Sequence, residues 1–430
     1  MRIEGFMTSL LTPIVKVFKG NQENSFYTQQ DYEKWIVGKK GWHAKYYKGL
    51  GTSTPKEGKE YFRNFKMVSY NWDEFADEKI DMAFNKKRAD DRKSWLGNYD
   101  ENLILDIGQS GVMVSDFINK DLIHYSNYDN IRSLPSIDGL KPSTRKVLFC
   151  SFKRNLVKDI KVAQLSGYIS EHGAYHHGEV SLQGAIIGMA QDYCGSNNIN
   201  LMVPNGQFGS RLLGGEDHAA CRYIYTRLNK LAGIIYDKRD EPILHYMVDD
   251  DGKKIEPRNY MPIIPMILVN GTKGIGTGWS CNIPQYNPLD IVENIKKLIA
   301  GEQCEEMSPW YRGFKGNFKR LGKMSWICRG VHTIVGDNTV IISELPIGSW
   351  TDNYKKHLDY LIIGSEEVKK DKKGKKIENV QWIKSYKDST TDSEVRFEVK
   401  FDANISSDLL GKRTADGISG VEELLKLTHK

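Results

Sequence analysis

The sequence has no long apolar run, no secretory signal and no clustered cysteines. No stretch of about 18 or more apolar residues occurs, so the sequence gives no sign of a membrane-spanning helix. The apolar stretch near the N-terminus is interrupted by Pro13 and lacks a basic lead-in followed by a cleavage site. The six cysteines lie between Cys150 and Cys328 and form no CxxC pair. We therefore expect reduced intracellular thiols rather than a zinc cluster or a disulfide framework.

A strong excess of charge of one sign is also absent. The 430 residues include 61 Lys and Arg against 55 Asp and Glu, a net charge of +6. This mild excess permits a polyanionic partner without requiring one, because a local basic stripe can bind phosphates on a nearly neutral protein. Six lysines gather at 369–376, a run typical of a solvated loop, with nonspecific phosphate contact as the minority interpretation.

Three segments with different patterns suggest two or three domains, which the length allows. Residues 1–95 are typical of the end of an α/β unit, with Thr28 as the N-cap of a helix. Residues 96–300 form the largest apolar block. Residues 301–430 predict a separate α/β region with a strand–turn–strand pattern at 332–345 and an alternating strand at 394–402.

The most informative part of the central block is 131–190, which predicts three short helices with tight, glycine-containing connections. Pro142 suits the first position of one helix, and apolar residues follow it at helical spacing. A second helix is expected over 161–173 and a third from near Gly178. A helix-turn-helix core and a generic helical bundle fit this pattern equally well.

Six motifs carry a family resemblance over nearly the whole chain and in the family's order. They are KYYKGLGTS at 45–53, SLPSIDGLKPSTRKVLF at 133–149, AYHHGEVSL at 174–182, PNGQFGSRLLGGEDHAACRYIYTRL at 204–228, IPMILVNGTKGIGTGWSCNIP at 264–284 and ELPIGSW at 344–350. These motifs closely resemble the DNA breakage–reunion region of eukaryotic-type DNA topoisomerase II, a type IIA enzyme.

The resemblance implies a multidomain α/β and α+β architecture. Residues 1–95 would be the C-terminal part of a Toprim domain with its connecting tail, 96–300 a winged-helix DNA-cleavage domain, and 301–430 the partial α/β tower domain. The partners implied are double-stranded DNA and, in the full-length enzyme, a second copy of the chain. The resemblance also implies a nuclear location, with a viral or other intracellular site as the alternative. No membrane partner is expected, since the sequence has no long apolar run.

In this family a tyrosine attacks a DNA phosphodiester and forms a transient 5′-phosphotyrosyl double-strand break, through which a second duplex passes in an ATP-dependent cycle. Tyr223 aligns with that nucleophile. Since a phenol with a pKa near ~10 is a weak nucleophile at neutral pH, it needs assistance. Arg222 is the candidate for binding the phosphate oxygens, and His177 for hydrogen-bonding the reacting phosphate. His176 ranks below His177 because a structural role is equally expected.

Four further residues match DNA-contacting positions of the family. Arg132, Lys141 and Arg145 match contacts to the DNA backbone. Ile275, on a glycine-rich loop, matches the apolar wedge that opens a base step and bends the duplex. Lys146 and Lys48 are weaker candidates for phosphate contact, while Asp138 is expected either to stabilise a turn or to act in the site.

The family's metal ligands are not recognisable in the sequence. Mg²⁺ for cleavage is held by Toprim carboxylates in EGDSA-like and DxDG-like motifs, and neither is found in the Toprim part of this sequence; the run DDDG at 249–252 lies after the tyrosine, in another domain. The acidic run at 249–251 matches a turn and is assigned no metal. We expect the ligands for Mg²⁺ and for ATP to lie outside this chain, and the fragment alone to be inactive in strand passage. The alternative is a noncatalytic winged-helix DNA-binding module.

Overall fold

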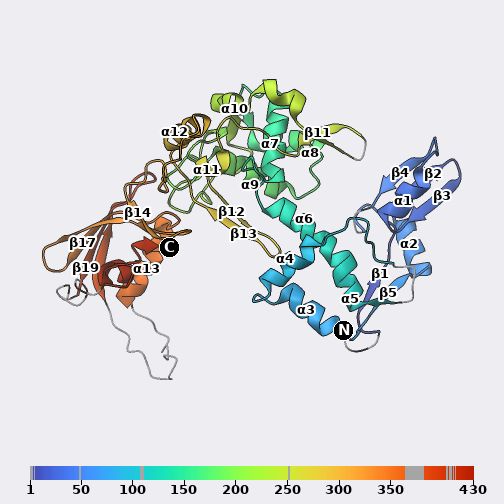
Figure 1. The fold of residues 1–430 in the computed structure, drawn as a ribbon, viewed down its shortest axis with the longest axis horizontal. Coiled ribbons are helices and arrows are strands. Elements are labelled where there is room, and N and C mark those ends of the chain that lie inside the picture. The colour runs from blue at the N-terminus through green and yellow to red at the C-terminus, as the bar shows by residue number, and fades with distance from the viewer. Residues whose placement is uncertain are drawn as a thin grey trace. The chain divides into compact units, whose positions relative to one another are not determined.

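The computed structural model describes all of the chain except residues 1–2, 4, 48–49, 107–110, 250–251, 364–381, 403–404, 406–408, 410 and 412. Lys48, part of the acidic run at 249–251 and the lysine-rich run at 369–376 lie outside the described residues. The described residues mix helices and strands and divide into two compact units (Figure 1). The first unit comprises Met1–Asn130 with Gly276–Trp279, and the second comprises Ile131–Ile275 with Ser280–Lys430.

The first unit contains two small sheets and a helical hairpin. Its strands are β1 (Thr8–Leu10), β2 (Val15–Lys19), β3 (Gln22–Phe26), β4 (His43–Tyr46), β5 (Met67–Asn71) and β6 (Val112–Met113). Its helices are α1 (Gln29–Ile36), α2 (Pro55–Arg63), α3 (Ala76–Phe84), α4 (Ala89–Gly97), α5 (Val114–Phe117), a π-helical turn (Ile118–Leu122) and α6 (Ile123–Ser133), whose last residues belong to the second unit. The strand orders are β1-β5-β6, with β5 and β6 parallel, and β3-β2-β4, which is antiparallel throughout.

Side-chain caps fix where two of these helices begin. The Thr28 hydroxyl accepts a hydrogen bond from the Asp31 N–H at 3.2 Å, so the predicted N-cap of α1 is confirmed. Thr54 and Glu57 form a capping box at α2, with Pro55 in the first helical position. Hydrogen bonds to Glu57 outweigh its burial and lower the pKa of this carboxyl to about 2.

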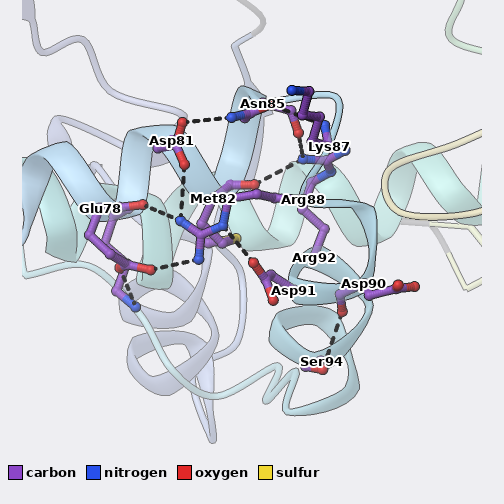
Figure 2. A network of polar contacts seen from close by, with 11 residues as sticks. Glu78, Asp81, Met82, Asn85, Lys87, Arg88, Asp90, Asp91, Arg92 and Ser94 are labelled. Carbon is purple, nitrogen blue, oxygen red and sulfur yellow. Dashed lines mark hydrogen bonds and ion pairs between the residues drawn. The ribbon is translucent and has the colours of Figure 1, made fainter.

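Arg88 holds the α3–α4 hairpin together (Figure 2). Its guanidinium contacts Glu78 and Asp81 on α3 and Asp91 on α4, at N–O distances of 3.0, 3.2 and 2.5 Å. Arg92 donates to the carbonyls of Met82 and Asn85 at the end of α3. Carbonyls at the end of a helix lack partners within that helix, which explains why a basic side chain stabilises the turn.

The first part of the second unit is a helical core with short strands. Its helices are α7 (Pro142–Lys153), α8 (Val162–His172), α9 (Glu179–Ala190), α10 (Lys230–Ile235), a 3₁₀ helix (Lys238–Ile243), α11 (Met266–Val269) and α12 (Pro288–Ile299). Its strands are β7 (Ile160–Lys161), β8 (Met202–Asn205), β9 (Tyr225–Leu228), β10 (Tyr246–Val248), β11 (Lys254–Pro257), β12 (Thr272–Ile275) and β13 (Ser280–Ile283). The three helices predicted within 131–190 are confirmed as α7, α8 and α9, and the antiparallel sheet β7-β9-β8 accompanies them.

A separate core lies in the last part of the chain. Its elements are β14 (Asn317–Gly322), β15 (Ser325–Arg329), β16 (Val331–Val335), β17 (Thr339–Glu344), α13 (Thr351–Ile363), β18 (Ile383–Asp388), β19 (Phe397–Phe401), α15 (Gly420–Leu424) and β20 (Thr428–His429). The antiparallel sheet β16-β17-β19-β18 is covered by α13, and buried residues such as Leu358 and Phe397 form the core between them. The predicted strands at 332–345 and 394–402 are confirmed. Among the described helices, none is both long and apolar enough to cross a bilayer.

Candidate functional site

Tyr223 lies on a turn that is fixed by α8 and by the sheet. The carbonyls of Cys221 and Ile224 accept hydrogen bonds from the Ala163 and Val162 N–H groups, both at 3.1 Å. These N–H groups belong to the first turn of α8, where no helical carbonyl is available to them. Ile224 is buried, whereas the Tyr223 side chain is 65% exposed. The backbone is therefore held while the phenol faces solvent.

Arg222 lies beside the phenol. Its guanidinium carbon is 4.7 Å from the centre of the Tyr223 ring, which is within range of a cation–π contact. Both side chains are exposed. No carboxylate in the described part of the chain forms an ion pair with Arg222, so its charge is available to an anionic ligand next to Tyr223.

His177 lies on the short segment between α8 and α9. Its ring meets the ring of buried Tyr175 edge-on, with centroids 5.4 Å apart. Glu179 begins α9 two residues later. Tyr175, two residues before His177, and Ile224, next to Tyr223, are buried in one hydrophobic core cluster. The His177 segment and the Tyr223 turn are therefore anchored in the same core.

A second group of predicted residues gathers around β12. The Lys141 ammonium donates to the Lys273 carbonyl at 3.0 Å. A Cβ on Gly274 would lie 2.5 Å from the Ser133 carbonyl, so only glycine permits this approach of β12 to the end of α6. Arg132 is exposed in that last turn of α6, and Ile275, at the end of β12, is 72% exposed. The β12–β13 hairpin therefore carries Ile275 and contacts Lys141, and it packs against the end of α6 that carries Arg132.

Arg145 has other partners than those the sequence suggested. It is buried, and its guanidinium contacts both carboxylate oxygens of Asp138, at 2.8 and 2.9 Å, and the Leu140 carbonyl. Asp138 also accepts from the backbone N–H groups of Leu140 and Tyr260. Asp138 therefore holds its turn, one of its two expected roles. Arg145 would have to leave Asp138 to reach a phosphate, so its contact with DNA stays a prediction.

Lys146 is likewise held inside the protein. Its ammonium lies 2.8 Å from Glu256 on β11 and donates to the Gly173 carbonyl at 2.6 Å. No sequence pattern had singled out Glu256. The only available signal was a lone acid between Ile255 and Pro257 in a strand, and its partner is 110 positions away.

The described residues offer no site for a metal ion. No group of three or more His, Cys, Asp or Glu side chains among them is arranged to hold one. Asp250 and Asp251 lie outside the described residues. The donor set that Mg²⁺ prefers, several convergent carboxylate oxygens, is therefore not provided by the described part of this chain.

Comparison with known families identifies the chain. The family model for the A subunit of DNA gyrase/topoisomerase IV matches residues 132–416, more than half of the sequence. The chain belongs to the type IIA DNA topoisomerase family. The model for the C-terminal associated domain of TOPRIM matches residues 10–130. The family expected from the sequence motifs is confirmed, and the two matches meet where the two compact units divide. The predicted domain boundaries at 95 and 300 stay predictions.

Individual type II topoisomerases are similar over most of the chain. It is 51% identical over 372 residues to "Probable DNA topoisomerase 2" of Dictyostelium discoideum, covering 84% of this chain and 24% of that protein. It is 47% identical over 409 residues to "DNA topoisomerase 2" of Plasmodium falciparum, covering 94% of this chain and 28% of that protein. The chain thus spans about a quarter of the length of these curated relatives.

A solved structure shares the fold. It is the crystal structure of the Plasmodium falciparum topoisomerase II DNA-binding, cleavage and re-ligation domain. The TM-score is 0.76 at 45% identity, over 99% of this chain and 56% of that chain. The mixed α/β fold of a topoisomerase II cleavage region is therefore established for this chain.

Proposed function

We propose that this chain supplies the tyrosine side of the DNA-cleavage site of an ATP-dependent type IIA topoisomerase. The observation that carries the proposal is the exposed Tyr223 phenol, which lies beside the Arg222 guanidinium on a turn anchored to α8. In this proposal α7, α8, α9 and the sheet β7-β9-β8 form the winged-helix domain. Residues 1–95 are the later part of a Toprim domain with its tail, and residues 301–430 begin the tower.

The proposed reaction is a reversible transesterification. The Tyr223 oxygen forms a bond to a DNA phosphorus, the bond from phosphorus to the 3′-oxygen breaks, and that oxygen leaves as a hydroxyl after taking a proton. The phenol gives up its proton in the same step. Arg222 binds the nonbridging oxygens, where negative charge develops, and His177 donates a hydrogen bond to the same phosphate. Rejoining reverses these steps and conserves the bond energy.

DNA binding in this proposal uses the residues around β12. Arg132 and Lys141 contact the backbone, and Ile275 inserts between base pairs. Arg145, held by Asp138, shapes the turn that precedes α7. The parent enzyme would act in the nucleus as a homodimer on double-stranded DNA. Mg²⁺ and ATP would be held by residues outside this chain.

A covalent-trapping experiment tests the proposal. In the full-length polypeptide, Tyr223→Phe should abolish the denaturation-resistant protein–DNA adduct, because the attacking oxygen is gone. Tyr225→Phe is the matched control: this tyrosine lies two residues later on β9, is partly exposed, and should still form the adduct. An adduct that persists in Tyr223→Phe would place the nucleophile elsewhere. DNA binding without any adduct in the unaltered protein would favour the noncatalytic winged-helix module.

A further inference from the structure

Lys146 and Glu256 form an ion pair that the proposed reaction does not use. The Lys146 side chain is 13% exposed and that of Glu256 is 1% exposed. A charge removed from water in this way needs a close partner, and each supplies the other's. Two of the three ammonium donors are directed to Glu256 and to the Gly173 carbonyl. Lys146 is therefore poorly placed to contact a phosphate.

The Gly173 carbonyl lies at the end of α8, where the segment that carries His177 begins. Gly173 caps α8, and a Cβ there would lie 2.9 Å from the Ile169 carbonyl and 3.0 Å from the Cys150 sulfur. Carbonyls at a helix C-terminus lack helical partners and carry partial negative charge, so an ammonium group stabilises them. Lys146 thus fixes one end of the His177 segment.

The next residue is in a conformation that needs such support. Ala174 has a φ of +48°, in the left-handed region that side chains other than glycine rarely adopt. Such backbone strain persists only where surrounding contacts impose it. The contacts available here are the Lys146 hydrogen bond before Ala174 and the burial of Tyr175 after it. Tyr175 in turn packs against the His177 ring.

We propose that the Lys146–Glu256 pair is a positioning device for His177. The pair holds the end of α8, the held end imposes the turn at Ala174, and Tyr175 transmits that geometry to the imidazole. Lys146 and Glu256 are positioning residues, because neither reaches the reacting phosphate. The inference rests on the proposed function, since it assigns a purpose to the orientation of His177.

The first test measures the imidazole itself. The experiment records the NMR signals of labelled histidines in this chain. It compares the unaltered chain with Lys146→Met, Lys146→Arg and Glu256→Gln. Lys146→Met should move the His177 signal and leave that of His43 unchanged, because His43 lies on β4 in the first unit. Lys146→Arg keeps the charge and the donors, so its His177 signal should stay near that of the unaltered chain. Glu256→Gln keeps the shape and removes the charge, and it should produce a smaller shift in the same direction.

The second test measures cleavage in the full-length polypeptide. Lys146→Met should slow adduct formation by between about tenfold and 10²-fold, as expected when a group that contacts the reacting atoms is misplaced. Its Kd for DNA should change less than twofold, and Lys146→Arg should recover most of the rate.

Three results would overturn the inference. One is an unmoved His177 signal in Lys146→Met. Another is weaker DNA binding with normal cleavage of the bound DNA, which would make Lys146 a phosphate contact. The third is a lower Tm with normal cleavage below that Tm, which would make the pair purely structural. Failure of the proposed function is seen separately, as an adduct that survives in Tyr223→Phe.

Discussion

At the scale of single residues, exposure distinguishes Ile275 from the apolar residues that form the core. Its large β-branched side chain is 72% exposed at the end of β12. The preceding residue, Gly274, allows that strand to pack closely against the end of α6. Exposing such a side chain to water is unfavourable. Its place beside Arg132 and Lys141 suits a wedge that is buried only when DNA is bound.

Ile275→Ala should therefore reduce DNA bending while weakening DNA binding only modestly. The smaller side chain no longer opens the base step, whereas the backbone contacts remain. Fluorescence transfer between dyes at the two ends of a duplex measures the bend. Ile234→Ala, at an exposed isoleucine on α10 in the same unit, is the control and should bend DNA normally. An unchanged bend in Ile275→Ala would refute the wedge assignment.

At the scale of elements, a buried ion pair connects the loop before Tyr223 to β17. Arg211 and Glu344 are 5% and 2% exposed and contact each other directly. Glu344 also accepts from the Lys315 and Leu345 N–H groups, and Arg211 donates to the Leu345 carbonyl. The pair joins the core around α7–α9 to the core beneath the sheet β16-β17-β19-β18.

Arg211→Met should lower the free energy of unfolding of the second unit by about 3–5 kcal/mol, because it leaves the Glu344 charge buried and unpaired. Replacing both residues by Met should cost less than the sum of the single changes. Urea unfolding measures both effects. Arg239→Met, which removes an exposed partner of Asp237, should change stability little. Additive effects of the two core substitutions would show that the pair is not coupled.

The helices were more predictable from the sequence than the side-chain contacts between distant residues. The three helices within 131–190 follow from local signals: Pro142, apolar spacing and the glycines between them. The exposed Tyr223 and Ile275 were found through motifs. The burial of Arg145 was missed, because Asp138 is seven residues away along the chain and the Tyr260 N–H that completes the cluster is 122 positions from Asp138. Periodicity carries no information on contacts at that separation.

At the scale of the whole molecule, the chain corresponds to only part of the type II topoisomerases that it resembles. It spans about a quarter of the length of curated type II topoisomerases, and its described residues hold no metal site. In the proposed function, the carboxylates that hold the metal and the ATP-driven gate would come from outside this segment.

The purified 430-residue chain should therefore bind duplex DNA but should not relax supercoiled plasmid in the presence of ATP and Mg²⁺. Gel electrophoresis of the plasmid measures relaxation, with a full-length type II topoisomerase as the positive control. Relaxation that is lost in Tyr223→Phe would show that this segment is sufficient for strand passage. That result would contradict the location proposed for the metal and nucleotide sites.

The charges of Arg145 and Lys146 are neutralised by carboxylates inside the protein. This affects how strongly DNA binding should depend on ionic strength. A cation that contacts a phosphate displaces a counterion condensed on the duplex, and each displacement steepens the fall of affinity with salt. Arg145 and Lys146 are balanced by Asp138 and Glu256 and displace none while those pairs hold. Of the three cations at 141–146, only Lys141 forms no ion pair with a described carboxylate. If Lys141 contacts a phosphate as proposed, we expect this motif to release counterions as one contact rather than three.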